Sequence, residues 1–301
     1  MIDLKMIRGM PDLYDEDVER ISIVENICLE TFKSFNFQEF RTPIVENKTL
    51  FQRSVGESSD IIQKEVYEFE DRNGEILCLR PEGTAGLVRA LITNGLMNDE
   101  IKKFFYLGPM FRYERPQKGR KRQFFQAGAE LIGEESTKSD VEIILLAKTI
   151  LEKLNVKYTL EINYLGKEDS LNSYRSYLRK YLQNFKDELS EKVYSRLQRN
   201  PIRAIDSKDS NIQEIFKKAS DISDFLKKEE KESFERTIKS LKDLKIDFNL
   251  NKNLVRGLDY YTGTVFEFTV DGLGAQNAVI GGGRYDNCLL YTSPSPRDWM
   301  V

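Results

Sequence analysis

The chain has 301 residues, with 46 basic and 49 acidic side chains and a net charge of -3. This length suits one large domain or two smaller ones, and the slightly negative charge argues only weakly against nucleic-acid binding. No run of 18 apolar residues occurs and the N-terminus is acidic, so we expect neither a membrane-spanning helix nor a secretion signal.

Histidine is absent from the sequence, and the three cysteines are widely spaced, at Cys28, Cys78 and Cys288. A chain without histidine has no histidine general base, no Ser-His-Asp triad and no histidine metal ligand. The odd number of unpaired cysteines argues against a disulfide framework or a zinc site and fits a reducing compartment. We therefore expect a cytoplasmic protein without a metal site of its own, whose chemistry uses carboxylates and arginines.

The first third of the chain contains clear element signals. Apolar residues at helical spacing predict a helix over 17–35, whose buried stripe would include Val18 and Val24. The run 65–80 predicts a hairpin that turns at Arg72-Asn73-Gly74. Pro81 is expected to open a helix that ends near Gly95.

Two aromatic-rich runs, 103–113 and 122–133, flank a basic loop over 114–122 that lacks apolar residues. They predict two antiparallel strands joined by a solvated loop. Further along the chain, the capping-box pattern at Ser139 predicts a helix to about residue 154. Strands are then expected over 156–164, 253–270 and 275–280.

These elements predict an α+β fold, in which an antiparallel sheet of about six strands is flanked by helices. The Lys- and Glu-rich stretch 170–245 is mostly helical in pattern and is interpreted as a helical insertion. It would divide the core into 1–169 and 246–287. The tail 288–301 has no periodicity and two prolines, and we interpret it as foreign sequence.

Strand alternation places polar side chains of the two long strands on one face. Phe124, Gln126, Gly128 and Glu130 would share it, as would Arg112 and Glu114 on the partner strand. Phe125, Ala127, Ala129 and Leu131 would face a core. The polar face could simply meet solvent, which is common in half-exposed sheets. Phe124 and the gap at Gly128 favour a pocket for a polar ligand, since buried carboxylates are costly without one.

Six blocks in order resemble the class II aminoacyl-tRNA synthetases in their histidyl form. The segment 108–130, GPMFRYERPQKGRKRQFFQAGAE, resembles motif 2 of that class. The others are Arg8-Gly9-Met10, FRTPIVE at 40–46, LRPEGTAGLVRA at 79–90, LVRGLDYYTGTVFEF at 254–268 and GGGRYD at 281–286. A single block would be weak evidence, whereas six in order are strong.

The resemblance implies an aminoacyl-tRNA ligase that activates L-histidine with ATP and Mg²⁺, charges the histidine tRNA and forms a homodimer, with Pro43 at the interface. It implies catalytic roles at the α-phosphate for Arg112 and Arg256, and ATP contacts from Glu114, Arg120 and Phe124. The implied histidine-binding residues are Glu82, Thr84, Gln126, Glu130, Tyr260 and Tyr261.

The chemistry of the residues agrees with these roles. Amino-acid activation needs no general base, because the attacking carboxylate is already ionised at pH 7. It needs in-line positioning and neutralisation of phosphate charge, which arginines and Mg²⁺ supply. A neutral imidazole offers one donor and one acceptor, which a carboxylate and a tyrosine hydroxyl satisfy.

The sequence departs from the family pattern in two places. Phe125 stands where histidine is usual, and its expected position on the apolar face predicts little effect. The resemblance also stops at Asp286, before the third motif and the anticodon-binding domain, so we expect impaired activity of the chain as written. Two alternatives remain: a regulatory subunit of ATP phosphoribosyltransferase, which would not need Arg256 or an intact motif 2, and a class II synthetase of another specificity, disfavoured by the block 254–268.

Overall fold

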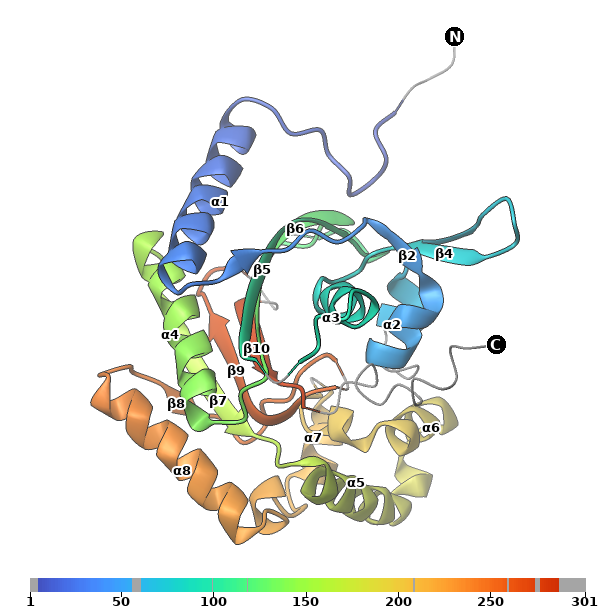
Figure 1. Cartoon of the computed structure of the whole chain (residues 1–301). Helices are drawn as coiled ribbons and strands as arrows, with labels where there is room; N and C mark the ends of the chain where they lie inside the picture. The colour runs from blue at the N-terminus through green and yellow to red at the C-terminus, as the bar shows by residue number, and fades with distance from the viewer. Residues whose placement is uncertain are drawn as a thin grey trace. The chain divides into compact units, whose positions relative to one another are not determined.

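The structure, a computed structural model, describes residues 5–55, 61–98, 100–117, 119–207, 209–258, 260–273 and 277–286. The chain separates into two compact units. The first is built mainly from Met1–Lys157 and the second from Tyr158–Val270 and Ala278–Asn287. The first unit contains two sheets and the second contains one, and each unit is described by itself below (Figure 1).

The first unit contains helices and two small sheets. Its helical elements are α1 (Glu16–Ser34), α2 (Lys48–Val55), the π-helical turn Ile61–Glu65, α3 (Thr84–Thr93) and α4 (Thr137–Lys153). Its strands are β1 (Gln38–Glu39), β2 (Val45–Asn47), β3 (Glu68–Glu70), β4 (Ile76–Leu79), β5 (Lys102–Phe111) and β6 (Gln123–Ile132). The predicted helix at 17–35 and the two predicted long strands are thereby confirmed.

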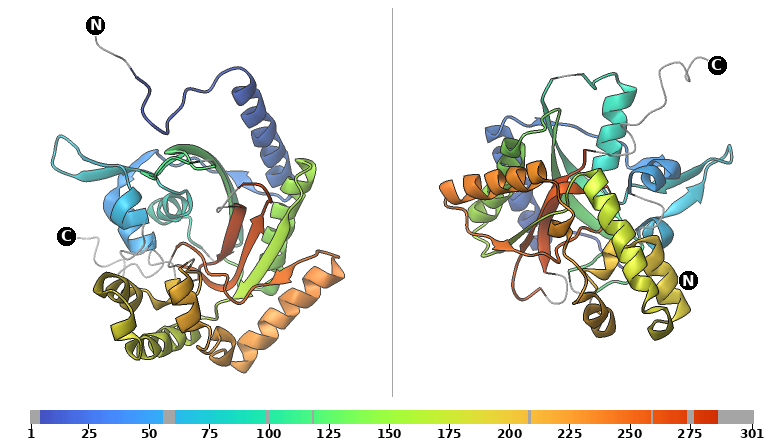
Figure 2. Two further views of the ribbon diagram at one scale, coloured as in Figure 1. Left: turned by 180° about the vertical axis from the view of Figure 1, so that it is seen from behind. Right: turned by 90° about the horizontal axis from the view of Figure 1, so that it is seen from below.

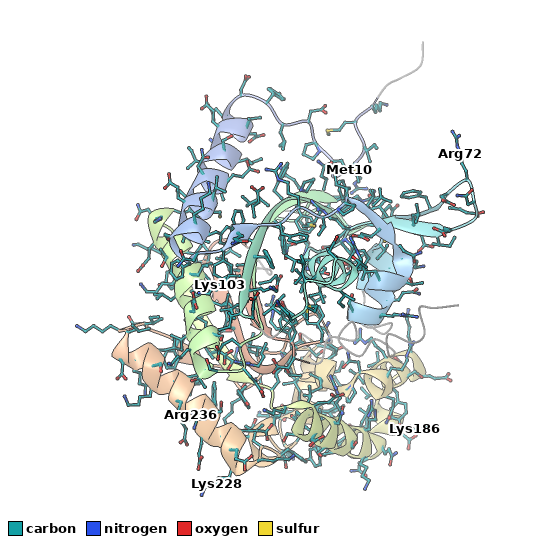
Figure 3. All side chains as sticks on the ribbon, in the orientation of Figure 1. Met10, Arg72, Lys103, Lys186, Lys228 and Arg236 are labelled. Carbon is teal, nitrogen blue, oxygen red and sulfur yellow. The ribbon has the colours of Figure 1, made fainter. Side chains whose placement is uncertain are left out.

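The long hairpin of β5 and β6 organises the first unit. The two strands pair antiparallel from Lys102↔Ile132 to Phe111↔Gln123, and β1 adds to β5 in parallel. A second sheet has the order β2-β4-β3 and contains the predicted hairpin. Arg72 lies at the tip of this hairpin and extends away from it (Figure 3).

Helices cover both faces of the β5–β6 hairpin. Phe105 of β5 stacks on Phe32 of α1, with ring centroids 4.8 Å apart, and Leu146 of α4 joins this cluster. On the opposite face, Leu87 of α3 packs with Tyr106. Figure 2 shows α3 and the hairpin side by side from two further directions. The polar face predicted from the alternation is therefore a helix-covered surface rather than one that meets solvent.

The helical cover of the apolar face is incomplete, which corrects two expectations. Phe125 is 43% exposed rather than buried in a core, because α1 and α4 contact this face only near Ala129 and Leu131. Val18 and Val24 of α1 are 44% and 43% exposed, since only the C-terminal half of that helix reaches the hairpin.

The second unit combines a four-stranded sheet with a helical region. Its strands are β7 (Thr159–Tyr164), β8 (Asn249–Leu250), β9 (Thr262–Thr269) and β10 (Ala278–Arg284), in the order β10-β9-β7-β8. Its helices are α5 (Glu168–Gln183), α6 (Glu191–Arg199), α7 (Ser210–Phe216) and α8 (Lys228–Asp243), with short 3₁₀ turns at Lys186–Glu188, Pro201–Ala204 and Ile222–Asp224.

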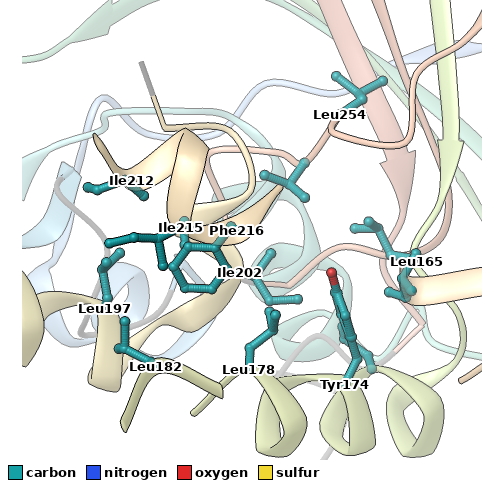
Figure 4. Close-up of a cluster of buried hydrophobic side chains, with 14 of the residues drawn as sticks. Leu165, Tyr174, Leu178, Leu182, Leu197, Ile202, Ile212, Ile215, Phe216 and Leu254 are labelled. Carbon is teal, nitrogen blue, oxygen red and sulfur yellow. The ribbon is translucent and has the colours of Figure 1, made fainter. Parts of the chain in front are cut away.

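The helical region has an apolar core of its own. Leu178, Leu182, Leu197 and Phe216 meet there, as Figure 4 shows. The same cluster includes Val265 of β9, so the helices pack on the sheet of their unit. The predicted helical insertion is thus confirmed as part of the fold class, whereas the boundaries at 169/170 and 245/246 stay predictions. The predicted tail 288–301 lies outside the described residues.

Four details of the sequence interpretation were wrong. The described strands form sheets of three, four and three strands rather than one of about six, because alternation locates strands but does not assign partners. Residues 253–258 are not a strand, since the side chain of Asn163 donates to the carbonyls of Lys252 and Leu254 and holds a loop there. Helix α3 begins at Thr84 rather than Pro81, and α4 follows Ser136 rather than Ser139.

No described helix has both the length and the apolar character needed to cross a membrane.

Candidate active site

The N-terminus of α3 holds a buried carboxylate. Glu82 is 2% exposed, and its two oxygens accept hydrogen bonds from the main-chain N–H groups of Thr84 (2.7 Å) and Ala85 (2.8 Å). Glu82 thus satisfies donors that the first turn of a helix leaves unpaired, which explains why the helix starts after it. Burial raises the pKa of Glu82 above its ordinary value, while these N–H groups and Arg112 act in the opposite direction.

A second buried carboxylate, Glu130 on β6, connects three elements. It is 6% exposed. Its Oε1 accepts from the hydroxyl of Thr84 at 2.8 Å and from the hydroxyl of Tyr106 at 3.3 Å. Charge-assisted bonds of this kind fix a carboxylate in one orientation. Strand β6, strand β5 and helix α3 therefore all contribute to the position of Glu130.

Tyr106 is the residue that the sequence interpretation missed at this place. Its ring lies between Gly83 and Gly128, where a Cβ on either glycine would overlap it. The expected gap at Gly128 is therefore filled by this ring. The available signal was the strand register, since Gly128 stands directly opposite Tyr106 in the β5–β6 pairing.

Arg112 lies just beyond the end of β5. Its Nε donates to the carbonyl of Pro81 at 2.9 Å, and its guanidinium carbon lies 5.2 Å from the ring centroid of Phe124. The expectation that Arg112 and Glu114 share a strand face was wrong. Strand β5 ends at Phe111, and the N–H of Glu114 donates to the carbonyl of Arg112, so the chain turns there.

An unsatisfied polar atom lies on the same side of the hairpin. The side-chain oxygen Oε1 of Gln126 is buried and has no hydrogen-bond partner among the described residues. Buried polar atoms are nearly always paired, so an orphaned one indicates a polar ligand or a water. Gln126 shares its strand face with Phe124 and Glu130, and Gly128 stands between Gln126 and Glu130 on that face.

The basic loop between β5 and β6 contains an internal ion pair. Arg120 Nη1 lies 2.5 Å from Glu114 Oε2. The guanidinium carbon of Arg122 lies 3.8 Å from the ring centroid of Tyr113, and the main-chain N–H of Arg122 donates to the carbonyl of Gly9 at 2.7 Å. Gly9 has a φ of +83°, a conformation that glycine adopts without strain. The loop is therefore anchored by the N-terminal segment.

The second unit contributes Arg256, Tyr260 and Tyr261. The rings of the two tyrosines lie 4.7 Å apart, and Tyr260 is 7% exposed. A Cβ on Gly281 of β10 would overlap the guanidinium of Arg256, and one on Gly283 would lie 2.9 Å from Cδ1 of Tyr261. Because residues two apart share a strand face, Arg256 and Tyr261 lie on the same side of β10.

The candidate residues thus form two groups. In the first unit, Glu82, Thr84 and Glu130 meet at the start of α3. Phe124 lies in the apolar cluster that α3 forms with the hairpin, and Gln126 lies on the same face of β6. In the second unit, Arg256 and Tyr261 gather on β10. The convergence of the two groups on one cleft stays a prediction.

Comparisons with known proteins give a consistent family. The model of the histidyl-tRNA synthetase family matches residues 9–292. Histidine--tRNA ligases of Prochlorococcus marinus and Dictyoglomus turgidum are each 45% identical, over 290 and 291 residues. Both matches span 96% of this chain and, respectively, 69% and 71% of the relative.

Solved structures agree with the sequence matches. The apo histidyl-tRNA synthetase of S. aureus superposes with a TM-score of 0.76 at 35% identity, over 97% of this chain and 69% of that one. A protein of Bacillus halodurans, described as an ATP phosphoribosyltransferase regulatory subunit/histidyl-tRNA synthetase, shares the fold with a TM-score of 0.69 at 21% identity. The chain therefore belongs to the histidyl-tRNA synthetase family, and the expected fold class is confirmed.

Proposed function

We propose that this chain activates L-histidine with the Mg²⁺ complex of ATP and transfers the histidyl group to its tRNA. The observation that carries the proposal is the buried, unsatisfied Oε1 of Gln126 on the same strand face as the buried carboxylate of Glu130, in a chain 45% identical to histidine–tRNA ligases. Glu130 is a fixed acceptor and Gln126 has an unsatisfied oxygen, so both suit a small polar ligand rather than an apolar one.

The activation step balances without a general base. A carboxylate oxygen of histidine attacks the α-phosphorus of ATP, a new P–O bond forms, and the bond to the β-phosphate oxygen breaks to release pyrophosphate. Negative charge builds on the α-phosphate oxygens during this displacement. Arg112 and Arg256 would neutralise that charge, a role that a chain without histidine can fill.

The histidine subsite would use two carboxylates, that of Glu130 on β6 and that of Glu82 just before α3. Glu82, Thr84 and Gln126 would bind the amino and carboxylate end, while Glu130 with Tyr260 and Tyr261 would bind the imidazole. A neutral imidazole presents one N–H donor and one nitrogen acceptor. A buried acceptor that is already oriented rejects a side chain without an N–H, because the acceptor would then stay unpaired.

The ATP subsite would use the loop after β5. Phe124 would stack on the adenine, Glu114 would lie near the adenine edge, and Arg120 would contact the γ-phosphate. Arg120 is paired with Glu114 in the structure. Binding of ATP would therefore exchange the carboxylate partner of Arg120 for a phosphate, a partner that carries more charge.

We further propose that the chain is a cytoplasmic homodimer whose interface includes the segment around Pro43. The neighbouring side chains of Ile44 and Val45 are 43% and 39% exposed, so they offer adjacent apolar surface next to Pro43. Sedimentation velocity should then show a dimer that Ile44→Asp dissociates. A monomer over the whole concentration range would contradict this assembly.

The function is tested by histidine-dependent exchange of pyrophosphate into ATP. Glu130→Ala should raise KM for histidine at least tenfold and leave KM for ATP within about twofold. The reason is that, of the two substrates, the carboxylate would contact only histidine. Arg112→Ala should lower kcat by roughly 10²–10³. Phe125→Ala is the matched control, because Phe125 neighbours Gln126 but points to the exposed face. Equal loss of both affinities in Glu130→Ala would contradict the assigned role.

A further inference from the structure

A polar row crosses the sheet of the second unit next to Arg256. Glu267 on β9 pairs with Gly281 of β10 on one side and with Glu161 of β7 on the other. Residues paired in this way have side chains on the same face of a sheet. Arg256 comes from the loop that precedes β9 and reaches the same row, where its Nη1 donates to Oε2 of Glu267.

Gly281 creates the space that the guanidinium of Arg256 occupies. A Cβ at this position would overlap Nη2, Cζ and Nη1 of Arg256. The guanidinium therefore lies against the main chain of β10, beside the strand partner of Glu267. With Gly281 on one side and the Glu267 carboxylate on the other, the guanidinium is held in a defined place.

The surrounding charges make Glu267 dependent on Arg256. Both side chains are about one-fifth exposed, at 20% for Arg256 and 21% for Glu267. Burial raises the pKa of Glu267, the carboxylates of Glu161 and Asp206 raise it further, and Arg256 is the strongest opposing influence. An ionised Glu267 is thus favoured mainly by the guanidinium that it holds.

The neighbouring carboxylates have other partners. The side-chain amide of Asn251 donates to Oε2 of Glu161 at 2.8 Å, and Nη1 of Arg203 lies 3.6 Å from Oδ2 of Asp206. On the guanidinium of Arg256, Nη1 donates to Glu267, whereas Nε is buried and has no hydrogen-bond partner among the described residues. Glu267 is therefore the carboxylate that orients Arg256, and its loss would leave a largely buried guanidinium without its ion-pair partner.

We propose that Glu267 is a positioning residue for histidine activation: it holds Arg256 against Gly281, so that the guanidinium is already aimed when charge develops on the α-phosphate. This inference rests on the proposed function. Glu267 itself touches no substrate, and it acts through Arg256. Removal of the outer partners that orient metal-ligating side chains typically changes affinity or activity about 10–100-fold, and we expect an effect of similar size for Glu267.

The kinetic test is a double-mutant cycle in the pyrophosphate exchange assay. Glu267→Gln keeps the side-chain shape and removes the charge, and it should lower kcat by about 10–100-fold with KM for histidine within about twofold. In an Arg256→Ala background the same substitution should cost nothing further, because its effect passes through Arg256. Equal losses in both backgrounds would show a general structural role and overturn the proposal.

Glu161→Gln is the matched control for the cycle. It removes a carboxylate from the same polar row, and that carboxylate does not contact Arg256. We expect kcat within about twofold of the unsubstituted chain, because the substitution leaves the ion pair of Glu267 and Arg256 in place. A loss as large as that of Glu267→Gln would assign the effect to the charge of the row and overturn the proposal.

A second measurement separates this inference from the proposed function. NMR of ¹⁵N,¹³C-arginine-labelled chain, with the Arg256 signal assigned through Arg256→Lys, reports rotation about the Nε–Cζ bond. Slow rotation that becomes fast in Glu267→Gln and stays slow in Glu161→Gln supports the pairing. Fast rotation in the unsubstituted chain refutes it. Absence of exchange activity in a chain with slow rotation would refute the proposed function, and the reaction role of Glu267 with it, while leaving the pairing established.

Discussion

Adding one methyl group at Gly128 should disturb both the packing and the polar bonds around Glu130. A Cβ in Gly128→Ala would overlap Cζ, Oη and Cε2 of Tyr106, a ring that is 6% exposed and closed on its other side by Gly83. The ring cannot move toward Gly83, where it already fills the space of a side chain. The hydroxyl of Tyr106 must therefore leave Glu130.

Two contributions set the magnitude. Overpacking of a tight interior costs about 1–3 kcal/mol. Loss of a hydrogen bond to a carboxylate adds about 1.5–3 kcal/mol, although Thr84 retains its own bond to Glu130. We expect a total loss of about 2.5–6 kcal/mol in the free energy of unfolding, a large share of the stability of a typical domain.

Urea unfolding followed by far-ultraviolet circular dichroism measures this loss. Gly86→Ala is the control. Its Cβ would meet Thr42 Oγ1 at 3.3 Å, a tight contact rather than an overlap, and alanine within a helix gains about 0.5–1 kcal/mol over glycine. The double variant Gly128→Ala/Tyr106→Leu lacks the overlapping atoms, so its loss should be smaller than the sum of the two single losses. A Gly128→Ala chain as stable as the unsubstituted one would refute the argument.

Three further predictions follow from buried groups. Glu230→Ala should lower the free energy of unfolding by about 1.5–3 kcal/mol in urea, because this buried carboxylate accepts from two main-chain N–H groups and a serine hydroxyl. The control is Glu229→Ala at the exposed neighbouring position, which should change it by less than about 0.5 kcal/mol. Burial raises the pKa of Cys28 to about 11 and that of Cys78 to about 12, so neither should react with a thiol reagent at pH 7.5 in the folded chain, and modification of either without urea would contradict this. The pKa values of Glu82 and Glu267 are raised in the folded chain. Their contribution to the free energy of unfolding is therefore present below the ordinary carboxyl pKa and is lost as pH rises through the raised values. The double variant Glu82→Gln/Glu267→Gln should flatten this part of the plot of unfolding free energy against pH, and an unchanged slope would contradict the assignment.

Long periodic segments were predictable from the sequence, whereas short strands were not. Nineteen residues at helical spacing define α1, and two ten-residue strands define the β5–β6 hairpin. Strands β1 and β8 have two residues each, too few to show any alternation. Their parallel pairing with β5 and β7 depends on tertiary packing that no local pattern encodes.

The candidate site divides in the same way. Residues within a recognisable block, such as Glu82 and Arg112, could be proposed as site residues from the sequence. Tyr106 could not, because its role depends on the register that places it opposite Gly128 and on a helix that approaches from elsewhere. Glu267 was missed as well, since it stands among apolar strand residues and its partner Arg256 lies in a loop eleven residues earlier.

The central claim is the proposed function, in which Arg112 and Arg256 both serve the activation of histidine by ATP. Isothermal titration with a non-hydrolysable histidyl-adenylate analogue tests it most directly. Arg112→Ala in the first unit and Arg256→Ala in the second should each weaken binding by at least tenfold, and the corresponding leucyl analogue should bind far more weakly than the histidyl one. Loss of affinity on substitution in one unit alone, or equal affinity for the two analogues, would contradict the account.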